Sequence, residues 1–160
     1  HCFGAQMMAR TLGGRVCANG WANIGWQRTH VVPAASRLFG TSEFIAFNWH
    51  YETFEIPSGA QRLLFGHHCL NKGFALGKHL AFQCHLEVTQ SIVREWCRAS
   101  CAELAAASGP AVQREEQILL QLDRHLPRLH QISRRVYTHW ASQLKRPPAV
   151  HCHARSGAPA

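Results

Sequence analysis

The chain changes texture near residue 90, where short apolar runs give way to longer amphipathic stripes. Short apolar runs bounded by turn residues are typical of buried strands, whereas apolar residues at helical spacing indicate helices. The strand candidates are residues 44–49, 62–65, 73–76 and 80–84, with a turn at residues 57–60. Strands followed by helices favour an α/β domain over an all-helical or all-strand one.

The helical part is expected to contain three helices. The first carries an apolar stripe over residues 92–104 and ends near Gly109. The second covers residues 111–126, and Pro127 is expected to interrupt it before a third helix begins. Residues 149–160 are rich in Ala, Gly, Pro and His, which predicts a frayed tail.

The beginning of the chain combines one helix with broken extended structure. Residues 3–12 carry apolar side chains at helical spacing, and the glycine pair that follows supplies a stop. Residues 14–32 are interrupted by Gly20 and Gly25, so short strands and turns are expected there.

The chain begins at His1, and Cys2 opens a Cys-x-Gly turn without the strand that normally precedes such a turn. We therefore expect a C-terminal fragment of a longer domain, inactive by itself. We divide it into a domain part at residues 1–97, a helical extension at residues 98–146 and a flexible tail at residues 147–160. Restoring the missing strands would complete a three-layer α/β domain.

Charge and cysteine content narrow the class of protein. The formal charge is +8, but the basic residues are scattered, so solvated helix faces explain it better than a nucleic-acid partner. No apolar window approaches the length of a membrane span, and no membrane partner is expected. The seven cysteines are odd in number and show no disulfide framework, which favours free thiols in a cytoplasmic protein.

Cys2 is a candidate nucleophile. It stands directly before the predicted helix at residues 3–12, where the positive end of the helix dipole favours a thiolate. Gly4 suits a sharp backbone turn, and the N–H of Phe3 would lie where an oxyanion develops. By itself the motif is weak, because an isolated cysteine is more often a small buried apolar residue.

His85 and Glu87 follow the strand candidate at residues 80–84. A nucleophilic cysteine needs a base that takes its proton and returns it to a leaving group, and the base needs a third group to orient it. A His-x-Glu pair just past a strand supplies both groups. Alone, the pair also fits an ordinary surface ion pair.

Together these motifs resemble the class I glutamine amidotransferases, in particular the stand-alone branch similar to the amidotransferase domain of GMP synthase. The matches run in chain order: Cys-Phe-Gly-Ala-Gln, Leu-Gly-Gly, Ile-Gly-Trp, a Trp-His-x-Glu-x-Phe-x-x-Pro stretch and Gln-Cys-His-Leu-Glu-Val-Thr. The family pattern is Gly-x-Cys-x-Gly-x-Gln, followed later by Gln-Phe-His-Pro-Glu. The resemblance implies that family's flavodoxin-like, three-layer α/β fold. It is specific to about residue 97 and looser to about residue 144.

The resemblance also implies roles for individual residues. Cys2 would be the nucleophile, His85 the general base and acid, and Glu87 the group that orients His85. Gln6 would contact the substrate amide or its acyl intermediate. The other residues expected to bind substrate are Phe3, Asn48, Trp49 and His50. A core aromatic explains Trp49 equally well, and His50 also fits a structural role.

Four positions depart from the family pattern. Leu86 replaces the proline between His and Glu, and Cys84 replaces the preceding phenylalanine, but the His-to-Glu spacing is kept. Tyr51 and Glu52 replace the glycine and aspartate of a Trp-His-Gly-Asp stretch, which affects contacts near the pocket mouth. The family's Gly-rich loop, which supplies a second oxyanion donor, would lie upstream of His1.

The implied activity is the glutaminase half-reaction, in which glutamine is hydrolysed to glutamate and ammonia through a γ-glutamyl thioester, without metal or organic cofactor. The ammonia would pass to a synthetase partner, or the parent protein would act as a hydrolase. Two rivals stay open: a γ-glutamyl hydrolase acting on a small conjugate, and a degenerate, non-catalytic binding module. A zinc site at residues 151–153, or at Cys97 and Cys101, is disfavoured because structural zinc needs four convergent ligands.

Overall fold

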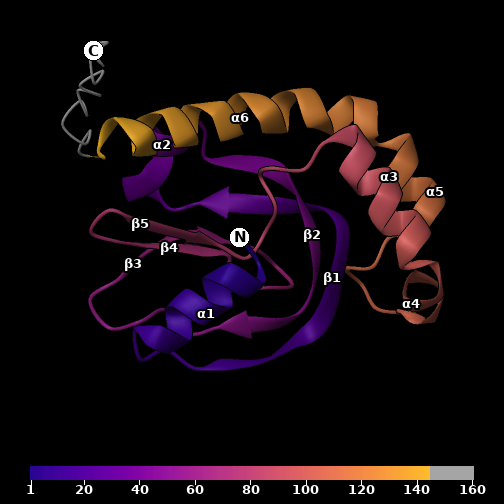
Figure 1. The fold of residues 1–160 in the computed structure, drawn as a ribbon, viewed down its shortest axis with the longest axis horizontal. Coiled ribbons are helices and arrows are strands. Elements are labelled where there is room, and N and C mark those ends of the chain that lie inside the picture. The colour runs from indigo at the N-terminus through magenta and orange to yellow at the C-terminus, as the bar shows by residue number, and fades with distance from the viewer. Residues whose placement is uncertain (145–160) are drawn as a thin grey trace, which may run out of the picture.

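The computed structural model describes residues 1–144, whose strands form one antiparallel five-stranded sheet. The strands are β1 (Val16–Val31), β2 (Glu43–Phe54), β3 (Gln61–Phe65), β4 (Gly73–Leu76) and β5 (His79–Phe82), in the spatial order β2-β1-β3-β4-β5. A register shift between Ala18 and Asn23 interrupts the pairing of β1 with β2, and such irregularities bend a strand pair. Figure 1 shows both strands curving round one side of the molecule.

Helices cover the sheet from two sides (Figure 1). α1 (Phe3–Thr11) packs against β5, while α6 (Leu122–Ser142) packs against β2 and α2 (Ser36–Phe39), which follows a 3₁₀ turn, η1 (Pro33–Ala35). Ala81 and Phe82 are neighbours in β5 but belong to different buried clusters, as the alternation of side chains requires when both faces are covered. The predicted α/β class is therefore confirmed.

The larger of the two cores lies between the sheet and the helical end. It joins Phe47 of β2 to Val93, Ile118 and Val136 of three helices, so the residues before and after position 97 share one core. Each fully buried side chain of this size contributes roughly 1.5–3 kcal/mol. The smaller core, beneath α1, contains Ala5, Ala9, Phe54, Phe74 and Ala81.

The prediction of short strands and turns over residues 14–32 was wrong, because β1 is one long strand. Gly25 does not break it. This glycine has a φ of 98°, and a Cβ at this position would collide with the side chain of Gln113. The space serves a loop that pairs with the strand: Gln113 Oε1 accepts from the amide of Trp26 at 2.7 Å, and Ile24 exchanges backbone hydrogen bonds with the same loop.

The helix boundaries in the second half also differ from the prediction. The first expected helix is split by Ser100 into α3 (Gln90–Ala99) and α4 (Cys101–Ala106), and the second shrinks to α5 (Glu115–Leu120). The carbonyl of Ile118, near the end of α5, accepts from the indole of Trp26 at 3.0 Å. Pro127 does not interrupt α6, since near the start of a helix its missing N–H costs few hydrogen bonds.

The remaining element predictions agree with the structure at their centres. The helix at residues 3–12, the turn at residues 57–60 and the four strands are confirmed, although β5 ends two residues early, at Phe82. The predicted tail and the candidate zinc ligands at residues 151–153 lie outside the described residues.

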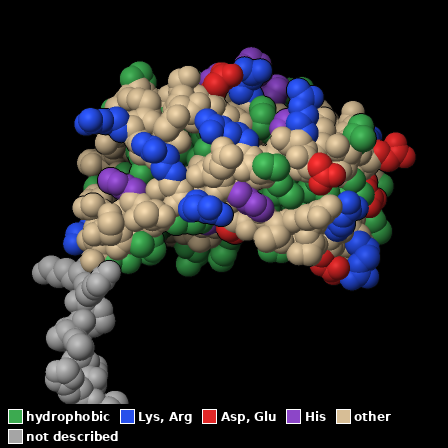
Figure 2. Space-filling model, turned by 90° about the horizontal axis from the view of Figure 1, so that it is seen from above, with side chains coloured by type: hydrophobic (Ala, Val, Ile, Leu, Met, Phe, Trp, Pro, Cys, Tyr) green, Lys and Arg blue, Asp and Glu red, His purple; other side chains and the backbone are tan. Residues whose placement is uncertain are grey.

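The surface carries its positive charge in scattered form. On the face shown in Figure 2, the Lys and Arg side chains are separated by polar and apolar atoms and do not gather in one patch. Within residues 1–144, no helix combines the length and apolar character needed to cross a bilayer.

Candidate active site

Cys2 occupies the turn between the edge strand of the sheet and α1. Its amide donates to the carbonyl of Phe82 at the end of β5 (2.8 Å), and its own carbonyl accepts from the amides of Ala5 and Gln6 (2.9 and 3.0 Å). Its φ of 45° is the one positive value at a non-glycine residue between residues 1 and 144. Side chains other than glycine rarely adopt such a conformation, so the turn is strained and the thiol is held at the start of the helix.

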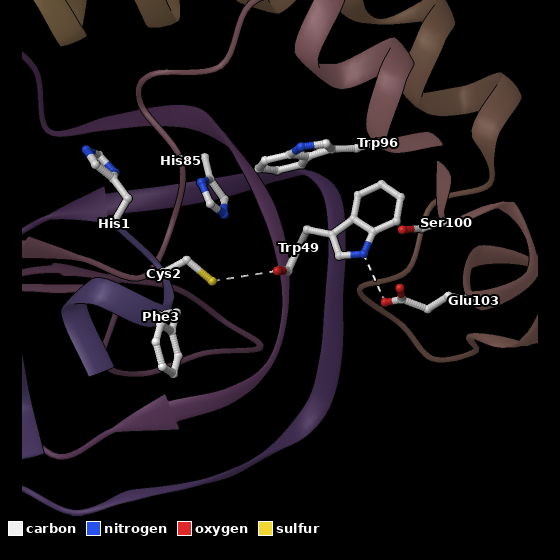
Figure 3. A pocket seen from close by; sticks show the side chains of 8 residues that line it. All are labelled: His1, Cys2, Phe3, Trp49, His85, Trp96, Ser100 and Glu103. Carbon is white, nitrogen blue, oxygen red and sulfur yellow. Dashed lines mark hydrogen bonds between the residues drawn. The ribbon is translucent and has the colours of Figure 1, made fainter. Parts of the chain in front are cut away.

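His85 is tied to the neighbouring part of the sheet. Its amide donates to the carbonyl of Phe47 in β2 (2.8 Å), and its ring packs edge-on against Trp96, with ring centroids 4.8 Å apart. The Nδ1 atom lies 2.6 Å from Oε1 of Glu87. Figure 3 shows the other ring nitrogen directed toward the sulfur of Cys2. The imidazole thus lies between a carboxylate and a thiol.

The charges of this trio depend on one another. Burial by itself lowers the pKa of His85, but hydrogen bonds with Cys2 and Glu87, and the charges of both groups, outweigh burial and raise it to about 9. At Glu87, burial raises the pKa of the carboxyl, but the hydrogen bond and charge of His85 outweigh it and the net pKa is lowered. Protonated His85 and ionised Glu87 are therefore favoured at neutral pH, an arrangement that stabilises a thiolate at Cys2.

The cysteines of the core are chemically different from Cys2. Cys84 is fully buried, and burial is the main cause that raises its thiol pKa to about 12. Burial likewise raises the pKa of Cys97 to about 11. Such thiols stay protonated and act as small apolar residues. Cys2 is half-buried and lines a cavity.

That cavity has a volume of about 440 Å³ and opens beside the sulfur. Its lining residues are His1, Cys2, Phe3, Trp49, His85, Trp96, Ser100 and Glu103 (Figure 3). The indole N–H of Trp49 donates to Glu103 Oε1 at 3.0 Å, and the Trp49 and Trp96 rings meet edge-to-face at 6.3 Å. Strand β2 and helices α3 and α4 therefore build one wall, opposite the start of α1.

Two of the predicted substrate-binding residues lie at this cavity. Phe3 is exposed at its rim, and the carbonyl of Trp49 lies 3.8 Å from the sulfur of Cys2. Sequence reasoning missed Trp96, Ser100 and Glu103, which follow no motif. The helical stripe marked Trp96 only as a core residue, and polar positions on a predicted helix give no signal that they face a pocket.

Three other predicted substrate-binding residues do not line the cavity. Gln6 is buried and donates to Gln83 Oε1 at 3.3 Å. Asn48 is buried and donates to a carbonyl of its own strand at 2.9 Å. His50 is buried too, and burial, followed by the charge of Lys72, lowers its pKa to about 3. Their predicted contacts with substrate stay predictions.

A second imidazole, unassigned by sequence reasoning, lies beside the trio. The Nδ1 atom of His1 lies 3.1 Å from Oε2 of Glu87 and 2.9 Å from the carbonyl of Cys84. Its Nε2 atom lies 2.6 Å from the hydroxyl of Tyr137 in α6. The motif that singled out Cys2 leaves the preceding position open, so no sequence signal marked His1.

No protein-family model and no curated protein matches this chain. Solved structures do match it. One is a glutamine amidotransferase of Methylobacillus flagellatus, with a TM-score of 0.88 and 40% identity, covering 96% of this chain and 66% of that one. Another is a glutamine amidotransferase of Thermotoga maritima, with a TM-score of 0.77 and 27% identity, covering 87% of this chain and 60% of that one. The chain thus spans somewhat under two thirds of the length of these relatives.

A more distant likeness concerns the fold alone. A GMP synthase component from Thermoplasma acidophilum matches with a TM-score of 0.50 and 24% identity, covering 65% of this chain and 58% of that one. The two amidotransferase structures match the curled sheet and helices described above.

Proposed function

Because this chain belongs to the glutamine amidotransferases, we propose that its Cys2, His85 and Glu87 form the site at which the side-chain amide of glutamine is hydrolysed. The supporting observation is the contact of His85 with both partners: Nδ1 lies 2.6 Å from Glu87, and the ring hydrogen-bonds with Cys2, which lies far away in the chain. A nucleophile, a base and an orienting carboxylate are the groups that acyl transfer requires.

In the first half of the reaction, the Cys2 thiolate attacks the amide carbon of glutamine. Nδ1 of His85 is held by Glu87, so Nε2 is the nitrogen that gives its proton to the leaving group. The carbon–nitrogen bond breaks, ammonia leaves, and the sulfur remains bonded to the γ-carbonyl as a thioester. His85 is left neutral and ready to act as a base.

In the second half, water attacks the thioester. His85 takes one proton of this water, the carbon–sulfur bond breaks, and glutamate leaves. The thiolate and the imidazolium are restored together, and the positive charge of His85 is stabilised by Glu87 throughout. The N–H of Phe3, the first residue of α1, has no partner within the helix and supports the oxyanion of both steps.

The test is glutamine hydrolysis by the full-length protein. Ammonia and glutamate are expected in equal amounts, and Cys2→Ser is expected to lower kcat by about three orders of magnitude or more, since such groups act as a unit. Cys101→Ser changes another accessible thiol and serves as the control, because Cys101 lies outside the cavity lining.

A glutamine-like electrophile provides a second readout of the same proposal. It is expected to form a covalent adduct at Cys2 and none in the Cys2→Ser variant. A full-length protein that neither hydrolyses glutamine nor forms this adduct would contradict the proposal and favour the non-catalytic binding module.

A γ-glutamyl conjugate is a second candidate substrate, favoured by the composition of the cavity wall. Of its lining residues within the described chain, Glu103 is the carboxylate and none is Lys or Arg, and two indole rings stand beside it. Aromatic faces and a carboxylate suit a cationic group. We propose that a γ-glutamyl amine with a positively charged end would fit here, and assays of glutamine against such an amine separate the two substrates.

The fate of the ammonia belongs to the same proposal. A likeness in fold to a GMP synthase component agrees with a synthetase that accepts ammonia as the partner. Stimulation of glutamine hydrolysis by a co-purified synthetase would support this partner, and ammonia release at an unchanged rate would favour a free-standing hydrolase.

A further inference from the structure

We propose that His1 and Tyr137 are positioning residues of this site, which hold the carboxylate of Glu87 in place against His85; the inference rests on the proposed function. The two oxygens of Glu87 face two different imidazoles. Oε1 lies 2.6 Å from Nδ1 of His85, and Oε2 lies 3.1 Å from Nδ1 of His1. The two rings are stacked, with centroids 6.4 Å apart.

The contacts of His1 define its hydrogen positions. Both neighbours of Nδ1, the carbonyl of Cys84 and the carboxylate of Glu87, are acceptors, so Nδ1 carries a hydrogen. In the neutral ring Nε2 is then an acceptor, and it takes the hydroxyl hydrogen of Tyr137 at 2.6 Å. Burial first, and then the charge of Glu87, raise the pKa of Tyr137 to about 12, so this hydroxyl keeps its proton.

Such a chain of contacts restrains a side chain that would otherwise turn freely. The side chain of Glu87 is 40% exposed, and the contact with His85 alone engages one of its two oxygens. A second donor on Oε2 fixes the plane of the carboxylate, and Tyr137 fixes the ring that provides this donor. Outer partners of this kind orient the groups that they touch. Helix α6 is thereby linked to the proposed base through Tyr137, His1 and Glu87.

The arrangement also divides the negative charge of Glu87 between two rings. While His1 donates to Oε2, part of the charge is compensated away from His85. Removal of His1 leaves the whole carboxylate to His85, which stabilises the imidazolium more strongly. The side chains that face Glu87 in the described chain are His85, His1 and Tyr137, with the thiol of Cys84 behind them. The pKa of His85 is therefore a readout that mere loss of packing would not move upward.

The experiment compares three variants of the full-length protein. His1→Leu removes the donor, His1→Asn keeps an N–H at the position of Nδ1, and Tyr137→Phe removes one hydroxyl. Trp140→Phe is the matched control, because Trp140 also joins α6 to the sheet by one hydrogen bond, to Lys78, but does not approach Glu87. The measurements are kcat and KM for glutamine and the NMR titration of the His85 ring.

His1→Leu is expected to lower kcat about three- to tenfold with little change in KM, and to shift the His85 titration to higher pH. His1→Asn is expected to restore both values toward the wild type. Tyr137→Phe is expected to lower kcat by a smaller factor, and to add nothing in the His1→Leu background, because it acts through His1. Trp140→Phe is expected to leave kcat and the titration unchanged.

Two results would overturn the positioning role: a His85 titration and kcat unchanged by His1→Leu, or an equal effect of Tyr137→Phe with and without His1. Failure of the proposed function has a different signature, since the wild type would then show no glutamine hydrolysis. The titration of His85 can be measured in either case, so the two failures are distinguishable.

Discussion

The indole of Trp49 donates a hydrogen bond to Glu103 across the mouth of the cavity, at 3.0 Å. This contact joins β2 to α4, so the helical end of the chain forms part of the wall around Cys2. The bond also holds a negative charge in place above the sulfur, where it meets the part of a substrate that remains outside the reacting amide.

Glu103→Gln is therefore expected to discriminate between substrates. The loss of one exposed charge should lower kcat/KM about two- to fivefold for a γ-glutamyl amine with a cationic end, and less for an uncharged γ-glutamyl amide of the same length. Glu95→Gln, in the adjacent helix α3, changes a carboxylate that pairs with Arg98 and does not line the cavity. Equal losses for both substrates would contradict the charge argument.

The raised pKa of His85 makes the folded state sensitive to alkaline pH. Its pKa of about 9 exceeds the ordinary value of 6.5, so its stabilising contribution is complete below pH 6.5 and is lost as pH rises toward 9. The loss for this buried group is on the order of 3 kcal/mol. Urea unfolding at several pH values should show this decline in the wild type. A His85→Gln variant with the same decline would contradict the assignment.

Gly25→Ala is expected to destabilise the chain by about 2–4 kcal/mol, because the new Cβ would meet the side chain of Gln113 and strain a backbone with φ of 98°. Gly20→Ala is the control within the same strand, where a Cβ meets nothing within 4 Å. Thermal unfolding measures the difference between them. Similar midpoints for the two variants would show that the loop containing Gln113 yields at little cost.

Trp26→Phe is expected to destabilise the chain by about 1–3 kcal/mol, since the carbonyl of Ile118 would lose its buried donor. Trp21→Phe changes an exposed indole in the same strand and should cost less than about 0.5 kcal/mol. Chemical unfolding of both variants provides the comparison, and an equal cost would show that the Trp26 bond contributes nothing beyond packing.

The sequence predicted the parts of this fold whose signals are local. Apolar runs between turns marked the strands, and Thr89, which caps α3 by accepting from the amide of Ile92 at 3.3 Å, precedes a clear helical stripe. β1 could not be predicted as one strand, because the partner that makes Gly25 compatible with it, Gln113, lies in a loop near the other end of the chain. Pairing over such distances leaves no periodic trace in either segment.

The candidate site divides in the same way. Cys2, His85 and Glu87 were identified because the order and spacing of their motifs resemble a family, and the structure brings their side chains together. Glu103 and Tyr137 could not be identified from sequence, since each belongs to a helix whose packing depends on the whole core. Their neighbours in the chain say only which side of the helix is apolar.

The anchoring of Cys2 to Phe82 determines how the molecule can move without losing its chemistry. The amide of Cys2 is tied to the last residue of β5, and His85 follows shortly after that residue, so one short piece of backbone carries both reacting groups. A displacement of that strand carries sulfur and imidazole together. The wall formed by Trp96 and Glu103 hangs from other elements, and it can swing outward to admit a reactant while the reacting pair keeps its spacing.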